Sequence, residues 1–218
     1  MILPPSTKIN IIFNSYAKEN YNFNTYFIFY FLFFKIFVFS YNTVNTNEEL
    51  SVLNQETNTH PLVESARNQI GIVTKYDNQY YNGGYPPEGR GACTDVIERA
   101  LMDQGYDLKN KIDKDMLNFP EEYPYKSDPN INYRRVVNLK IFFDRYFKKI
   151  DLEQDWQPGD IVTYDQIPGG LWHIAILSDK KNKDGIPLLI HNYGRGVIED
   201  DFLFKWPAAI TGHYRLRV

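Results

Sequence analysis

The sequence predicts an α+β fold in which a helix bearing the only cysteine packs on an antiparallel β-sheet. Two observations predict it. Apolar residues recur at helical spacing after Cys93, and the last third of the chain consists of short β-branched or aromatic runs separated by Gly, Pro and Asp-Gly turns. The 218 residues are enough for one sizeable core.

The N-terminal region contains an apolar, aromatic run, YFIFYFLFFKIFVF, at residues 26–39, whose one charge is Lys35. It is shorter than the ~20 apolar residues of a transmembrane helix and closer to the ~7–15 of a signal-peptide core. Residues 1–45 are therefore predicted to be a signal peptide or an uncleaved membrane anchor. A translation start assigned too far upstream would explain the long polar segment that precedes the apolar run. The alternative to a targeting segment is that the run forms a buried aromatic strand or helix.

The rest of the chain divides into a linker and one domain. Residues 46–61 are polar, rich in Asn and Thr and bounded by Pro61, which is typical of a linker. Residues 62–218 are predicted to form the folded domain. We expect an exported protein in the periplasm or cell envelope, attached to the membrane if the N-terminal segment is retained.

The net charge and the cysteine count limit what the protein can do. A formal net charge of −3 gives no support for a nucleic-acid partner. One cysteine has no intramolecular disulfide partner, and a free thiol in an oxidising compartment is a liability unless it is used or well buried. Cys93 is therefore a packing residue, a metal ligand or a nucleophile.

Cys93 lies where an amphipathic helix is predicted to begin. Val96, Ile97, Ala100 and Leu101 form one apolar stripe, and the spacing places Cys93 on that stripe in the first turn. A natural C-terminal stop follows at residue 105, a glycine. The positive end of the helix dipole and the unpaired backbone N–H groups are expected to lower the pKa of the thiol.

Other elements follow from the same patterns. A short helix is predicted within residues 62–77, and loops at residues 78–91 and 118–132. A second amphipathic helix is predicted within residues 133–150, with Val136, Leu139, Phe143 and Phe147 on one stripe. Four consecutive antiparallel strands are expected at residues 159–165, 171–179, 187–194 and 208–218.

A hairpin brings two histidines together in this prediction. His173 opens one strand and His191 closes the next, and a symmetric hairpin centred on Asn182 places them directly opposite each other. The same register pairs Ala175 with Leu189 and Leu177 with Pro187. Directly opposed side chains share a face of the sheet, so the two imidazoles are expected to be neighbours.

A first-turn cysteine facing two histidines has the geometry of a thiol hydrolase. Cys93 would attack an amide carbonyl, and His173 would take the thiol proton and return it to the leaving amine. His191 would orient the ring of His173, as the third member of a triad does. The backbone N–H of Cys93 and a tyrosine hydroxyl from the preceding loop would stabilise the oxyanion.

Several motifs resemble a known family at this point. The stretch YYNGGYPPEGRGACTD is similar to the loop and helix start of the NlpC-type cell-wall cysteine peptidases, which have a papain-like α+β fold. GDIVTYD, HIAILSD and LLIHN resemble that family's three strands. The resemblance implies nucleophile, base and orienting roles for Cys93, His173 and His191, an oxyanion role for Tyr81, and cell-wall peptides as substrate.

The chain departs from that pattern in two places. ACTD stands where the family usually has Asp-Cys-Ser-Gly, and the insertion between helix and sheet is longer than usual. That insertion, together with HNYGRG and ITGHYRL, looks closer to the exported bacterial family called domain of unknown function 1287, from about residue 62 to the C-terminus.

The charged and aromatic candidate residues each have more than one possible role. A zinc site made of Cys93, His173 and His191 is disfavoured because no short-spaced ligand pair supports it, so no metal or organic cofactor is expected. Asp95 fits a first-turn helix stabiliser better than a catalytic acid. Trp172 would shield the site from water or simply pack. Three arginines could pair with substrate carboxylates, although solvated surface charges are the more common case: Arg134, Arg135 and Arg195.

The function predicted from sequence is therefore a cysteine peptidase or amidase that hydrolyses an amide bond through an acyl-thioester on Cys93. Two alternatives stay open. One is a non-catalytic module that binds cell-wall peptides or a protein and carries a vestigial triad. The other is a thiol acyltransferase or transpeptidase that uses the same residues.

Overall fold

A computed structural model describes residues 59–152 and 155–217, within a compact unit that spans Thr59–Val218. The predicted targeting segment, residues 1–45, and nearly all of the predicted linker lie outside the described residues. In the part that is described, no helix is long and apolar enough to cross a membrane. The helices and strands, in chain order, are α3 (Pro61–Arg67), β1 (Lys75–Tyr76), β2 (Arg90–Gly91), α4 (Cys93–Met102), α5 (Leu108–Asn118), the 3-10 turns η1 (Pro120–Glu122) and η2 (Asn132–Arg134), α6 (Val136–Tyr146), β3 (Lys148–Lys149), β4 (Ile161–Ile167), β5 (Leu171–Lys181), β6 (Pro187–Asn192), β7 (Val197–Asp200) and β8 (Ile210–Arg215).

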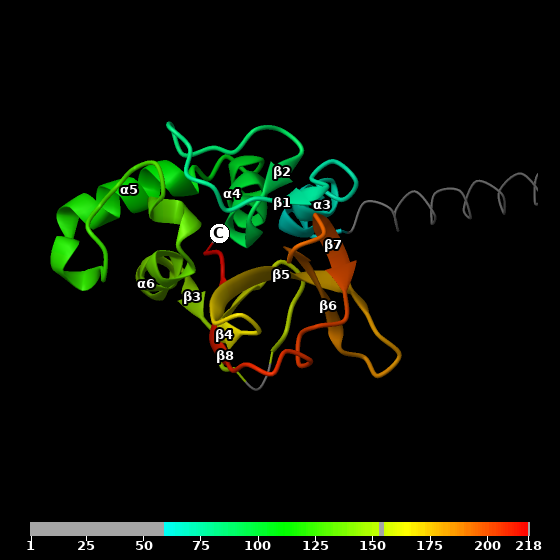
Figure 1. Cartoon of the computed structure of the whole chain (residues 1–218). Helices are drawn as coiled ribbons and strands as arrows, with labels where there is room; N and C mark the ends of the chain where they lie inside the picture. Colours follow the sequence, from blue (N-terminus) through cyan, green and yellow to red (C-terminus); the bar gives the residue numbers. More distant parts are fainter. Residues whose placement is uncertain (1–58, 153–154, 218) are drawn as a thin grey trace, which may run out of the picture. The chain divides into compact units, whose positions relative to one another are not determined.

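The predicted mixed α+β architecture is confirmed. Six antiparallel strands form one sheet in the order β3-β8-β4-β5-β6-β7 (Figure 1). The last strand, β8, inserts between β3 and β4 and does not continue outward from its predecessor, β7. Two short parallel strands, β1 and β2, form a separate ribbon beside the start of α4.

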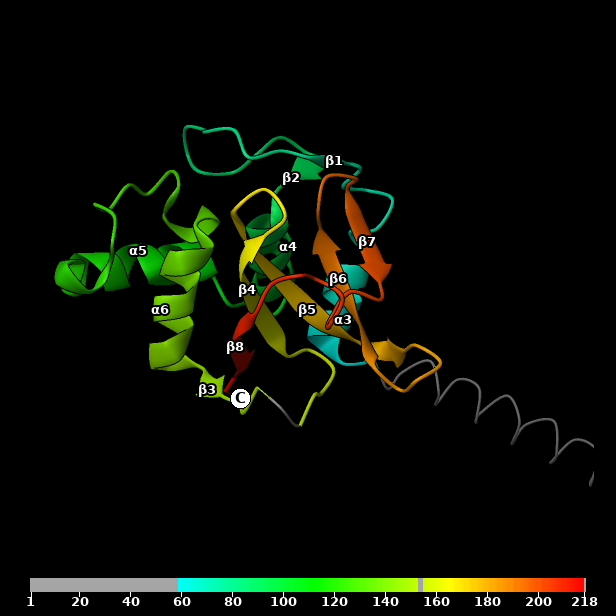
Figure 2. The same ribbon diagram turned by 60° about the horizontal axis from the view of Figure 1, so that its bottom comes forward.

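Alternation along the strands divides the core between the two faces of the sheet. On one face, Ile161, Ile174, Ile176 and Ile190 pack in a single cluster with the buried side chains of α4 and α6. The other face is covered by residues 201–209, which cross the sheet between β7 and β8 in Figures 1 and 2. We call these the helix face and the loop face.

Helix α4 begins at Cys93, as the sequence predicts. The Asp95 carboxylate accepts a hydrogen bond from the backbone N–H of Ala92 at 2.6 Å, which satisfies a donor that the helix leaves unpaired. Val96, Ile97, Ala100 and Leu101 are all buried. The helix ends at Met102, and Gly105 follows with a φ of 74°, a conformation that favours glycine.

The hairpin between β5 and β6 has a different register from the predicted one. Leu177 pairs with Leu189 and Ile176 with Ile190, two residues away from the symmetric arrangement. The turn is centred beyond Asn182, whose side chain accepts hydrogen bonds from the backbone of Asp184 and Ile186. A register shift between Leu177 and Lys181 takes up the extra residues of β5. A two-residue shift preserves the face of every side chain, so His173 and His191 remain on one face.

Helix α5 was not predicted, although its apolar side chains recur at helical spacing. Leu108, Ile112 and Met116 are four residues apart and buried. Asp107 caps the helix by accepting a hydrogen bond from the backbone N–H of Asn110 at 2.9 Å. By contrast, the predicted stripe of the second helix is confirmed: Val136, Leu139 and Phe143 of α6 are buried, and so is Phe147 directly after its end.

Candidate functional site

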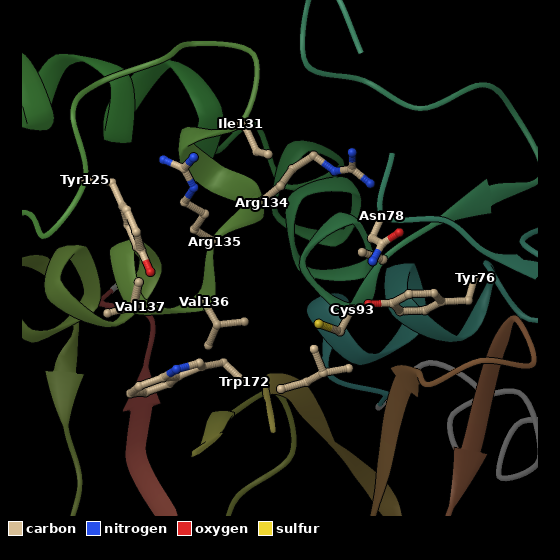
Figure 3. A pocket seen from close by; sticks show the side chains of 12 residues that line it. Tyr76, Asn78, Cys93, Tyr125, Ile131, Arg134, Arg135, Val136, Val137 and Trp172 are labelled. Carbon is tan, nitrogen blue, oxygen red and sulfur yellow. The ribbon is translucent and has the colours of Figure 1, made fainter. Parts of the chain in front are cut away.

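A cavity of about 310 Å³ opens beside Cys93 (Figure 3). Its walls come from the β1 strand and the loop that follows, the start of α4, residues 125–137 and the start of β5. The lining residues are Tyr76, Asn78, Ala92, Cys93, Tyr125, Ile131, Arg134, Arg135, Val136, Val137, Leu171 and Trp172. The walls are thus mostly apolar and aromatic, with two arginines among them, as in sites for small organic ligands.

The sulfur of Cys93 points into this cavity, toward Val136 and Trp172, and the Tyr76 hydroxyl points toward the sulfur (Figure 3). Only 5% of Cys93 is exposed. Burial raises the pKa of the thiol to about 12, and the backbone N–H groups of Ile174 and Thr94 only partly offset this. The predicted lowering of the pKa is wrong, because desolvation of the thiolate outweighs the helix start. The thiol is neutral at physiological pH.

The two predicted histidines do not face Cys93. His173 pairs across the sheet with Tyr164 and contacts Trp206 on the loop face, with ring centroids 5.5 Å apart. Cys93 belongs to the helix-face cluster together with Ile174, the next residue of β5. Since successive side chains of a strand point to opposite faces, the imidazole of His173 and the sulfur lie on opposite sides of the sheet. The expected Cys-His-His triad is not assembled in this structure.

The histidines instead form a network of their own. His173 Nε2 lies 2.6 Å from His191 Nδ1, and His191 Nε2 lies 3.0 Å from Asp200 Oδ1. This confirms that the two imidazoles are neighbours on one face. Three aromatic residues enclose the pair: Tyr164, Tyr193 and Trp206. Burial, and then the neighbouring His191, hold the pKa of His173 well below its usual value.

Arg134 and Arg135 have different roles although both line the cavity. Arg134, with 3% of its side chain exposed, donates to the Asp95 carboxylate at 3.0 Å and to the backbone carbonyls of Asp77, at 2.6 Å, and Gln79. Arg135 lies over the Tyr125 ring, 4.5 Å from its centroid. Among the described residues, its guanidinium has no hydrogen-bonded or ion-paired partner.

Of the remaining predicted site residues, one lines the cavity and two hold neighbouring parts of the protein in place. Trp172 lines the cavity and is 37% exposed. Asp95 is buried and holds Arg134 and the Tyr133 hydroxyl, 2.8 Å away, so its role is structural. Tyr81 donates to Asp77 Oδ2 at 2.8 Å and is not among the lining residues; Tyr76 is the tyrosine beside the sulfur.

A second cavity, of about 470 Å³, adjoins the first because Tyr125 and Arg135 line both. Its other residues are Lys126, Ser127, Asp128 and Pro129. No group of three or more His, Cys, Asp or Glu side chains that could hold a metal ion is found within residues 59–152 and 155–217.

Comparisons with known proteins give a family and a relative. The family described as "Domain of unknown function (DUF1287)" matches residues 63–216. The chain is similar to "Uncharacterized protein YijF" of Escherichia coli (strain K12), with 41% identity over 178 residues that cover 76% of this chain and 85% of that protein. No solved structure matches.

Proposed function

The chain belongs to the DUF1287 family, and we propose that this member is a non-catalytic binding module whose Cys93 cavity takes the carboxylate of a peptide. Cell-envelope peptides are the favoured ligands, because the loop and strand motifs resemble those of cell-wall peptidases. The apolar run at residues 26–39 supports export to the compartment where such peptides occur.

The observation that carries this proposal is the unpaired guanidinium of Arg135 at the cavity. A guanidinium presents five donors in a planar fork that matches a carboxylate in a bidentate pair. Both Nη atoms of Arg134 donate to protein groups, whereas the guanidinium donors of Arg135 have no partner among the described residues and are available to a ligand. Arg135 also precedes α6, and among the described residues no side chain caps that helix start. The positive end of the helix dipole adds to the attraction for an anion.

The apolar walls define the rest of the ligand. Val136, Leu171 and Trp172 surround the sulfur, and burying apolar ligand surface against them would contribute roughly 25 cal/mol per Å². A short peptide with small apolar side chains and a free carboxylate combines both features. The neutral thiol of Cys93 would then be a wall of the cavity.

A cysteine hydrolase is the second candidate, and a thiol acyltransferase would need the same arrangement. It is favoured by the position of Cys93 in a cavity, with backbone N–H groups of Ile174 and Thr94 directed at the sulfur, where they would stabilise a thiolate. It also requires a base that reaches the thiol. Both imidazoles of the predicted triad are buried on the loop face, so the binding module is the better supported reading.

Binding of a defined pair of peptides tests the proposal. N-acetyl-alanyl-alanine carries a free carboxylate, and its C-terminal amide does not. Isothermal titration should show binding of the acid and at least ~10-fold weaker binding of the amide, since a charged hydrogen bond contributes about 1.5–3 kcal/mol. Arg135→Gln should remove the preference for the acid. Arg195→Gln, which changes an exposed arginine that does not line the cavity, should keep it.

Two results would contradict the proposal. One is equal affinity for the acid and the amide in the wild-type protein. The other is hydrolysis, detected by mass spectrometry as N-acetyl-alanine released from the dipeptide probe or as fragments released from muropeptides. If Cys93→Ala abolished these products, the protein would be a hydrolase.

A further inference from the structure

The histidine network on the loop face is connected to the cavity on the helix face by the chain itself. His173 stands between Trp172, which lines the cavity, and Ile174, whose backbone N–H is directed at the sulfur of Cys93. Any displacement of the His173 backbone therefore moves two parts of the cavity wall.

The second connection runs through β6. Asn192, which follows His191, is buried and donates its side-chain N–H to the carbonyl of Gly91 at 2.8 Å and to that of Lys75 at 3.3 Å. Gly91 lies two residues before Cys93, and Lys75 directly precedes Tyr76. The amide of Asn192 thus fixes the ribbon of β1 and β2 against the sheet, and with it two residues that face the ligand.

The hydrogen bonds of the network determine where its protons lie. The Asp200 carboxylate accepts from His191 Nε2–H, so in the neutral pair His191 Nδ1 is the acceptor and His173 Nε2–H the donor, 2.6 Å apart. One added proton can be held on His191 opposite Asp200, provided that His173 changes tautomer. That tautomer carries its proton on His173 Nδ1, which faces the aromatic enclosure and has no hydrogen-bond acceptor among the described residues, so the first added proton already drives the His173 ring away from His191.

We propose that protonation of the His173–His191 pair in acid weakens ligand binding in the Cys93 cavity, an inference that rests on the proposed function. Separation of the rings displaces the ends of β5 and β6, which carry Trp172 and Asn192. The titratable groups that face the pair are Tyr164 of β4, Tyr193 after β6 and Asp200 of β7; the segment 201–209 contributes Trp206, which does not titrate.

The probe's carboxylate, the Cys93 thiol and Glu98 are the other groups whose protonation could change the binding between about pH 7.5 and pH 4.5. The carboxylate of N-acetyl-alanyl-alanine has a pKa of about 3.5. Cys93 stays neutral, because burial raises its pKa to about 12. Glu98 of α4 does titrate in this range, since burial raises its pKa to about 7, so Glu98→Gln is the necessary control.

The experiment measures the affinity for N-acetyl-alanyl-alanine by titration calorimetry from about pH 7.5 to pH 4.5, and the intrinsic fluorescence of Trp156, Trp172 and Trp206 together is recorded in parallel without ligand. We expect at least ~5-fold weaker binding in acid and a fluorescence change with the same midpoint, which corresponds to about 1 kcal/mol of coupling. Glu98→Gln should behave as the wild type. His173→Gln should bind equally at both pH values. Asp200→Asn should move the midpoint to lower pH, because the carboxylate that stabilises an imidazolium is gone.

Amide hydrogen exchange at residues 74–76 and 91–94 separates the two proposals. Faster exchange in acid in the wild type than in His173→Gln or Asp200→Asn supports the coupling, even if the probe never binds and the proposed function fails. Equal exchange in all three proteins, or an unchanged affinity across the pH range in a wild type that binds the probe, overturns the coupling.

Discussion

Arg134 and Arg135 are consecutive in the chain, yet their side chains have different partners. Arg134 is hydrogen-bonded and ion-paired within the protein, whereas Arg135 lines the cavity without such a partner among the described residues. The guanidinium of Arg134 joins the Asp95 carboxylate of α4 to backbone carbonyls of the loop after β1. The guanidinium of Arg135 lies over the Tyr125 ring and is attracted by the Asp128 carboxylate, but it makes no hydrogen bond or ion pair among the described residues. The first arginine therefore positions the cavity wall, and the second can recognise what enters it.

This difference predicts opposite effects of one substitution at the two positions. Arg134→Gln leaves Asp95 buried without its ion-pair partner, which should lower the free energy of unfolding by about 3–5 kcal/mol. Arg135→Gln should change it by less than about 0.5 kcal/mol while it weakens the binding of carboxylates. Urea denaturation of both variants measures this. Equal stability losses would show that the two side chains are not distinct in role.

The thiol gives a second prediction. Because its pKa is raised to about 12, Cys93 should react with iodoacetamide more slowly at pH 7 than free cysteine does. His173→Gln should leave that rate unchanged, since the imidazole lies on the other face of the sheet. The rate is followed by mass spectrometry of the intact protein. If alkylation were faster than that of free cysteine and were slowed by His173→Gln, Cys93 and His173 would form a catalytic pair after all.

Glu98 gives a third prediction, on the pH dependence of stability. Its carboxyl is buried on α4, where it accepts hydrogen bonds from the Tyr85 hydroxyl and the backbone N–H of Lys109, each at 3.2 Å. Burial raises its pKa to about 7, so between about pH 4.5 and pH 7 the folded protein holds a proton that the unfolded chain has lost. Its contribution to stability is therefore full below pH 4.5 and is lost as the pH rises to 7.

Glu98→Gln should remove this loss, because glutamine resembles the protonated acid. The variant should be more stable than the wild type at pH 8, by at most about 3 kcal/mol, and similar to it at pH 4.5. Urea midpoints at the two pH values test this. A stability difference that is the same at both would rule out titration of Glu98 as the cause.

Patterns of local spacing predicted the two helices of the helix face and the four long strands. They worked because α4 and α6 each bury one stripe, and because turn residues separate the strands. The register of the hairpin was wrong by two residues, since β5 contains a register shift that no local signal marks. The place of β8 between β3 and β4 was not predicted, because pairing with β4 is a long-range contact that local spacing does not indicate.

The candidate site failed at one step, which was the choice of face. Alternation correctly placed His173 and His191 together, but it does not say which face of the sheet receives α4. The bulky aliphatic residues Ile174, Ile176 and Ile190 were the available signal, since a packed helix requires such a surface. Arg135 was singled out and does line the cavity, whereas the partner of His191, Asp200, gave no signal.

The assignment of faces can be tested by moving an imidazole across the sheet. Trp172 shares the cavity with Cys93 and is 37% exposed, so Trp172→His should fold and should present an imidazole on the side of the sulfur. A neighbouring imidazolium favours the thiolate, and alkylation of Cys93 at pH 7 should become roughly 10-fold faster, which equals a pKa lowered by about one unit. Trp172→Phe is the matched control, which opens the cavity equally without a base. If both variants alkylate at the same rate, position 172 does not face the sulfur, and the separation of the cysteine from the histidines would have to be abandoned.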